Sequence, residues 1–259
     1  MINPMDYPIV FFLVSLVVLW LSARTGVYWR RRRKLEEAER DDLGVIQSAA
    51  LTLLGLIIGF SFSMAVNRYD QRKNLEEEEA NAIGTEYLRA SLLPAADAAD
   101  VRALLRRYLD QRILFYTISS YTPSSARQLE QINATTAQLQ NELWSEVQAH
   151  ATTPPTPLLA LVVSGMNDVL NSQGYTQAAW WNRIPVAAWG LLGAIAIGCN
   201  LLVGYSARSE GTKPKRVFIL PLIVAISFLM IADLDSGHRG IIRVGAPNLV
   251  SLAHSLPAH

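Results

Sequence analysis

The feature that most constrains this chain is an uncharged run of 24 residues, Leu43–Val66, that continues into a polar sequence without a break. At about 1.5 Å per residue, such a helix is longer than the hydrocarbon core of a membrane, which is about 30 Å thick. No proline follows it until Pro94, and the intervening Asn67–Leu93 is rich in the helix formers Glu, Ala, Leu and Arg. We therefore predict a single helix that crosses a membrane and extends into water.

Three further segments are nearly free of charge. Only 17% of the 259 residues are charged, against about 25% in an average soluble protein. No Lys or Arg precedes the first of these segments, Tyr7–Ala23, and a basic run, Arg30–Lys34, follows it. This order is typical of a membrane anchor and not of a secretory signal. We predict four transmembrane helices, within Tyr7–Ala23, Leu43–Val66, Ile184–Ala207 and Val217–Ala232.

A polar sequence separates the second and third predicted spans. Its apolar residues recur every three to four positions, as in Val101, Leu105 and Tyr108 and again in Leu139, Leu143 and Val147, which predicts helices and no sheet. We therefore expect an all-α membrane protein with a helical extramembrane bundle inserted between the second and third spans. The predicted parts are 1–66 (spans one and two), 67–181 (helical domain), 182–233 (spans three and four) and 234–259 (tail).

The sequence gives little support for catalysis or for binding of metals or nucleic acid. The four histidines are scattered, and the one cysteine, Cys199, lies within the third span. We find neither a phosphate-binding glycine loop nor a nucleophile elbow. The helical domain has nine basic and thirteen acidic residues between Asn67 and Trp181, and an acidic surface disfavours nucleic acid. We expect no enzyme activity, no metal and no cofactor.

The second predicted span carries an unusual row of residues. Thr52, Leu56 and Phe60 lie four residues apart, and small or polar residues lie near the same face: Ser48, Gly59, Ser63 and Asn67. Small residues let helices approach closely, so one interpretation is packing between helices. The other is a pore wall, wetted by the polar residues and narrowed by a hydrophobic constriction. Spacing alone favours packing.

Acidic residues gather just beyond the second span, at Asp70, Glu76, Glu77, Glu78 and Glu79. The simpler interpretation is a solvated face of the helix. The alternative is a ring of carboxylates at the mouth of an oligomeric pore, where such rings attract cations.

Lys and Arg are distributed unevenly between the predicted loops. Ten lie in the two short loops, 30–42 and 208–216, and six lie near the membrane on the other side. The positive-inside rule therefore favours short loops in the cytoplasm and the helical domain outside.

Several short motifs resemble the bestrophins and, more closely, a group of bacterial bestrophin-like proteins. The stretch from Gly59-Phe60 to Arg68-Tyr69 resembles the end of the second bestrophin helix. The resemblance covers most of the chain, and its other motifs are Glu79–Thr85, Ala103–Tyr108, Asn182–Pro185, Asp233–Asp235 and Arg239–Val244.

The resemblance implies a pentameric ion channel whose pore is lined by the second helix. The bestrophin neck has three residues spaced by four, which correspond here to Thr52, Leu56 and Phe60, with a polar residue at the first position. The resemblance also implies that the helical domain lies in the cytoplasm, whereas the Lys and Arg count of the loops favours the outside. We adopt the orientation of the family. Metazoan bestrophins bind calcium after the last span. Here only Asp233 and Asp235 are present, so we expect them to pair with Arg239 or Arg243 instead.

The leading hypothesis is therefore a homo-oligomeric, pentameric channel, multi-pass in the bacterial inner membrane. Its partners would be the lipid bilayer, inorganic ions and further copies of the chain. The alternative is a non-conducting membrane scaffold or signal transducer that docks a partner protein on its helical domain.

Overall fold

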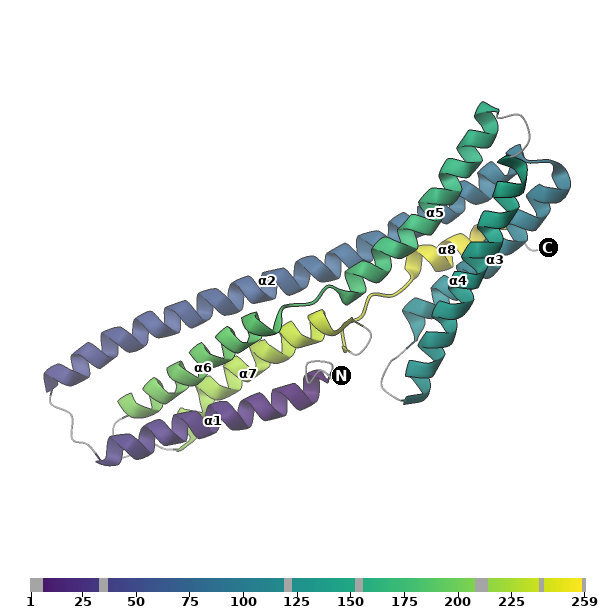
Figure 1. Ribbon diagram of the computed structural model, residues 1–259. Coiled ribbons are helices and arrows are strands. Elements are labelled where there is room, and N and C mark those ends of the chain that lie inside the picture. The colour runs from purple at the N-terminus through teal and green to yellow at the C-terminus, as the bar shows by residue number, and fades with distance from the viewer. Residues whose placement is uncertain are drawn as a thin grey trace. The chain divides into compact units, whose positions relative to one another are not determined.

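The protein is mostly helical in the part that the computed structural model describes, residues 7–32, 37–118, 123–151, 156–207, 214–237 and 240–257. No strand occurs among these residues, so the predicted all-α class is confirmed (Figure 1). The helices are α1 (Pro8–Arg32), α2 (Glu37–Arg89), the 3-10 helix η2 (Ala90–Leu92), α3 (Ala95–Thr117), α4 (Pro123–Ala151), α5 (Pro157–Trp181), α6 (Val186–Ser206), α7 (Pro214–Ser236) and α8 (Pro247–Ser255).

The chain divides into two compact units. The first, which we call the membrane unit, comprises Met1–Arg68 and Arg183–Ile242. The second, the helical unit, comprises Tyr69–Asn182 and Arg243–His259. The residues from Arg243 onward, which form part of the predicted tail 234–259, group with the helical unit.

Four helical stretches have the length and hydropathy needed to cross a membrane, as predicted. They are Pro8–Arg32, Glu39–Leu92, Pro157–Ser206 and Val217–Ser236. The second stretch contains the single helix α2, which continues well beyond its apolar window, as the absence of proline before Pro94 led us to expect. The protein is therefore a membrane protein of the predicted class.

Within the membrane unit, α1 packs against α6 and α7. The α1 and α6 backbones approach most closely at two glycines: a Cβ on Gly26 would collide with the backbone of Leu201, and one on Gly204 with that of Ala23. The Ser22 hydroxyl donates a hydrogen bond of 2.7 Å to the carbonyl oxygen of Ile197. Small residues that permit close backbone contact are the usual way in which helices associate in lipid.

Within the helical unit, the apolar stripes read from the sequence form the core. Val101, Leu105 and Tyr108 of α3 are fully buried, and so are Leu139 and Leu143 of α4. These side chains share one hydrophobic cluster with residues of α2, α5 and α8. The helical spacing of the sequence therefore identified this core correctly.

Candidate functional site

The predicted row on α2 lies on an exposed face of the membrane unit. Leu56 is 52% exposed and Phe60 63% exposed, and the other members of the row are exposed as well: Ser48, Thr52, Gly59, Ser63 and Asn67. Leu54 and Ala65, on the opposite side of the helix, are buried. Packing inside one chain therefore does not explain the composition of the row.

Two polar members of the row, Ser48 and Thr52, satisfy their donors within the helix. The hydroxyl of Ser48 donates to the Gly44 carbonyl oxygen at 2.9 Å, and that of Thr52 to the Ser48 carbonyl oxygen at 2.9 Å. Hydroxyl lone pairs stay free to accept from water or another polar group. A Cβ on Gly55 or Gly59 would meet nothing within 4 Å in the described chain. The row thus combines hydroxyls, open glycines and two large apolar side chains on one unpacked face.

The acidic residues beyond the span separate into two groups. Asp70, Glu77 and Glu78 are exposed. Glu76 and Glu79 are 0% exposed in a single chain. The expectation of a solvated face or of a ring at a pore mouth therefore does not describe Glu76 and Glu79, because their carboxylates are enclosed by other parts of the helical unit.

Glu76 holds the start of α8. Its carboxylate accepts hydrogen bonds from the backbone N–H groups of Asn248 and Leu249, both at 2.9 Å, and from the Asn248 side chain at 2.7 Å. The residue at the N-cap position, Ala246, makes no capping side-chain bond. The first N–H groups of a helix need acceptors and favour negative charge. The Glu76 carboxylate on α2 supplies both the acceptor and the negative charge.

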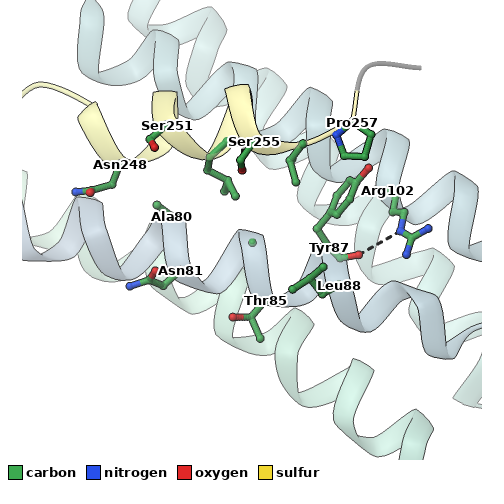
Figure 2. Close-up of a pocket in the computed structure, with 13 residues that line it drawn as sticks. Ala80, Asn81, Thr85, Tyr87, Leu88, Arg102, Asn248, Ser251, Ser255 and Pro257 are labelled. Atoms are coloured by element: carbon green, nitrogen blue, oxygen red, sulfur yellow. Dashed lines mark hydrogen bonds between the residues drawn. The ribbon is translucent and has the colours of Figure 1, made fainter.

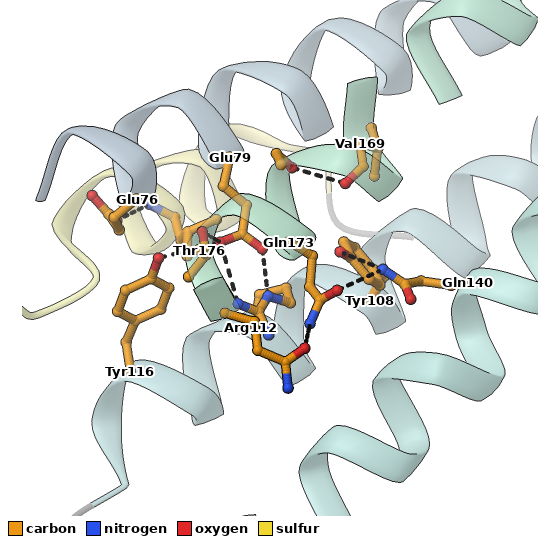
Figure 3. A network of polar contacts seen from close by, with 12 residues as sticks. Glu76, Glu79, Tyr108, Arg112, Tyr116, Gln140, Val169, Gln173 and Thr176 are labelled. Carbon is orange, nitrogen blue, oxygen red and sulfur yellow. Dashed lines mark hydrogen bonds and ion pairs between the residues drawn. The ribbon is translucent and has the colours of Figure 1, made fainter. Parts of the chain in front are cut away.

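Glu79 forms the centre of a buried polar network (Figure 3). Its carboxylate pairs with the guanidinium of Arg112 on α3, and both side chains are fully buried. It also accepts hydrogen bonds from Tyr116 at 3.3 Å and from Thr176 of α5 at 3.4 Å. Burial, reinforced by the Glu79 charge, raises the pKa of Tyr116 and that of Tyr108 above the usual range of a phenol. Both phenols are therefore neutral at physiological pH; Tyr116 donates to Glu79, whereas Tyr108 accepts a hydrogen bond from the Gln140 side chain at 3.5 Å.

Arg72, four positions before Glu76 on α2, is a further buried charged residue. Arg72, 1% exposed, donates to the carbonyl oxygen of Ala179 at 3.2 Å and lies over the ring of Trp180. Buried charges thus line one face of α2 at intervals of three or four residues, or a multiple of these: Arg72, Glu76, Glu79 and Glu86. We call this set the buried charge stripe. Its spacing is visible in the sequence, but charged residues at core positions are rare, so the sequence alone favours a solvated face for Glu76 and Glu79 and singles out neither Arg72 nor Glu86.

Glu86 differs from the rest of the stripe. It is 0% exposed, and neither carboxyl oxygen has a hydrogen-bond partner among the described residues. Burial raises its pKa to about 8, against an opposing effect of Arg89 and with a smaller contribution of the same sign from Asp168. Desolvation favours the neutral form of a carboxylic acid, so Glu86 is largely protonated at neutral pH.

A groove of about 670 Å³ lies between α2 and α8 in the helical unit (Figure 2). Uncharged polar side chains line much of it: Asn81, Thr85, Asn248, Ser251 and Ser255. At one end, Arg102 donates to the carbonyl oxygen of Tyr87 at 3.2 Å. The groove therefore exposes hydroxyl and amide groups beside the guanidinium of Arg102, which the hydrogen bond to Tyr87 holds in place.

The two carboxylates after the last span bind backbone amides. Asp233 accepts hydrogen bonds from Ile241 and Ile242 at 2.6 and 2.8 Å. Asp235 accepts from the N–H of Ile184 at 3.1 Å. Arg239, one of the partners we expected, lies outside the described residues. Asp233 thus fixes the turn that follows α7, and Asp235 links the end of α7 to the segment before α6, both within the membrane unit.

Comparison with known proteins agrees with the fold and with the motifs. The model of the Bestrophin-like domain matches residues 9–249. A bacterial bestrophin homolog from Klebsiella pneumoniae is 16% identical, with a TM-score of 0.59 over 96% of this chain and 99% of that chain. A variant of that homolog is 15% identical, with a TM-score of 0.58 over 95% of this chain and 99% of that chain.

A structure described as a membrane protein gives a TM-score of 0.61 at 15% identity, covering 94% of each chain. No curated protein matches significantly. Sequence identities this low show a shared fold and no more. The family is shown by the domain match, which extends over nearly the whole chain. The chain belongs to the bestrophin-like family.

Proposed function

We propose that this protein is a homo-oligomeric ion channel of the bestrophin type, pentameric, with α2 of each copy lining the pore. The observation that carries the proposal is the exposed row on α2. A membrane-crossing helix that presents hydroxyls, glycines and two large apolar side chains on an unpacked face is suited to surround a water-filled axis. Family membership supports the same assignment.

In this proposal each part of the row has a distinct role. Leu56 and Phe60 form a neck that excludes water, because a narrow apolar constriction disfavours hydrated ions. Thr52 is the third residue of the neck and is polar, so the apolar part of the neck consists of Leu56 and Phe60. The wider pore is lined by Ser48, Gly59, Ser63 and Asn67.

Three exposed carboxylates, those of Asp70, Glu77 and Glu78, are proposed to attract cations to one mouth of the pore. Glu76 and Glu79 have no such role, because their carboxylates are buried and already paired.

We further propose that the protein resides in the bacterial inner membrane with its helical unit in the cytoplasm, as in bestrophins. An alkaline phosphatase fused after His259 tests this orientation, since the enzyme is active only outside the cytoplasm. A silent fusion is expected. An active fusion would favour the opposite orientation, which the Lys and Arg count supports.

The channel itself is tested by ion flux from liposomes that contain the purified protein, with K⁺, Na⁺ and Cl⁻ gradients in turn. The double variant Leu56→Ala/Phe60→Ala should conduct more than wild type, because it widens and wets the neck. Phe62→Ala is the matched control: Phe62 is 39% exposed but points about 200° away from Phe60 around the helix. Absence of flux in both proteins, with oligomers intact, would favour a non-conducting scaffold.

A further inference from the structure

Glu86 stands out in the helical unit because it is a buried acid without a hydrogen-bond partner. The other members of the buried charge stripe each have bonds that offset their burial, including Arg112 for Glu79 and the start of α8 for Glu76. An unpaired buried carboxylate would be strongly unfavourable, so such a group normally takes up a proton.

The carboxyl of Glu86 lies directly against α5. A Cβ added to Gly165 of α5 would collide with the Glu86 Oε2 atom and would also come close to the guanidinium of Arg89. The absence of a side chain at Gly165 leaves room for the acid in the position that the structure shows. Glu86, Gly165 and Arg89 thus form a tight joint between α2 and α5.

We propose that this joint is a pH-sensitive device, closed while Glu86 holds its proton and loosened when the proton is lost. The neutral acid can occupy the confined position beside Gly165. The carboxylate lacks hydrogen-bond partners among the described residues at this position and is drawn instead toward water. That movement removes the side chain from its contact with α5.

The charged groups that act on Glu86 are Arg89 on α2 and Asp168 on α5. The 3-10 helix η2, which also packs against α5, carries only Ala90, Ser91 and Leu92 and contributes no titratable side chain. Burial and Asp168 oppose ionisation of Glu86, Arg89 favours it, and burial is the largest of the three effects. The pKa of Glu86 therefore rises to about 8.

The sign of the pH effect follows from proton binding. The folded state holds the Glu86 proton up to about pH 8, whereas a carboxyl of ordinary pKa, 4.5, releases it much earlier. Stability of the joint is therefore greatest at low pH, falls as pH rises between these two values, and is constant above them.

Hydrogen exchange of the α5 segment 160–170 tests the device without any need for ion flux. The wild-type exchange rate is divided by that of Glu86→Gln at each pH, so that the intrinsic pH dependence cancels. The ratio is expected to rise between pH 5 and 8, by up to about tenfold per pH unit for one proton, and then level off. Glu78→Gln, at an exposed position of the same helix, should give a wild-type profile.

A ratio that stays constant with pH would overturn the proposal. Should Glu86→Gln fail to fold, infrared spectroscopy of the wild type provides the second test. A carbonyl stretch of a protonated carboxylic acid should be present at pH 7 and lost by about pH 9. Its absence at pH 7 would also overturn the proposal.

Discussion

Glu76 and Asn248 are 172 positions apart in the sequence, yet the Glu76 carboxylate accepts both the backbone N–H and the side-chain amide of Asn248, at 2.9 and 2.7 Å. The acid lies on α2, the helix that carries the proposed pore row, and the amide lies in the first turn of α8. A helix near the C-terminus is therefore attached to the helical unit by a carboxylate that the sequence presents as one of four consecutive glutamates.

Removing this carboxylate should release α8. We expect Glu76→Ala to destabilise the attachment by about 1–3 kcal/mol, because buried N–H groups lose their acceptor. The measurement is limited proteolysis, followed with a C-terminal tag, in which the tag should be lost faster than in wild type.

Glu77→Ala is the matched control for that experiment, since Glu77 is the exposed neighbour. Its effect should stay within about 0.5 kcal/mol. Equal proteolysis of both variants would contradict the capping role of Glu76.

The buried pair of Glu79 and Arg112 should be strongly coupled. Arg112→Met leaves an unpaired carboxylate in the core and should cost about 3–5 kcal/mol. Glu79→Gln combined with Arg112→Met should recover most of that loss, because neither position of the pair then carries a charge. Thermal unfolding in detergent measures Glu79→Gln, Arg112→Met and the double variant, and strictly additive effects would show that the pair does not act as a unit.

The crossing of α1 and α6 should depend on the absence of a side chain at Gly204. Gly204→Ala places a Cβ against the Ala23 backbone and is expected to lower the thermal midpoint of the membrane unit. Gly198→Ala on the same helix meets nothing within 4 Å. That control should be neutral or stabilising by up to about 1 kcal/mol through helix propensity. Similar midpoints for the two variants would argue against the close contact.

Neutralising the exposed acids should change ion selectivity without changing stability. In Asp70→Asn/Glu77→Gln/Glu78→Gln, the permeability of cations relative to anions is expected to fall. The difference from wild type should shrink at high salt, because exposed charges are screened there. An unchanged ratio at low salt would remove these three residues from the path of the ions.

Much of the fold could be predicted from the sequence because it depends on strong local signals. Uncharged runs predicted the spans, and the absence of a proline between Val66 and Pro94 predicted the length of α2. Apolar spacing on α3 and α4 likewise predicted the core of the helical unit.

The buried charge stripe could not be predicted in the same way. Glu76 and Glu79 differ from Glu77 and Glu78 only in which face of the helix they occupy. Their partners, Asn248 and Arg112, lie 172 and 33 positions away. A carboxylate is buried only where such partners meet it, and that meeting is a property of the tertiary fold.

The central claim, that α2 lines an ion pathway, is tested most directly by placing a cysteine on its exposed row. Cys199, the one native cysteine, is buried, and Cys199→Ala gives a background without thiols. Liposome flux is then measured before and after a charged, water-soluble thiol reagent. Ser63→Cys should lose flux on modification, whereas Phe62→Cys, which points to another side of the helix, should not. Intact oligomers that conduct no ions, or equal block at both positions, would contradict the account.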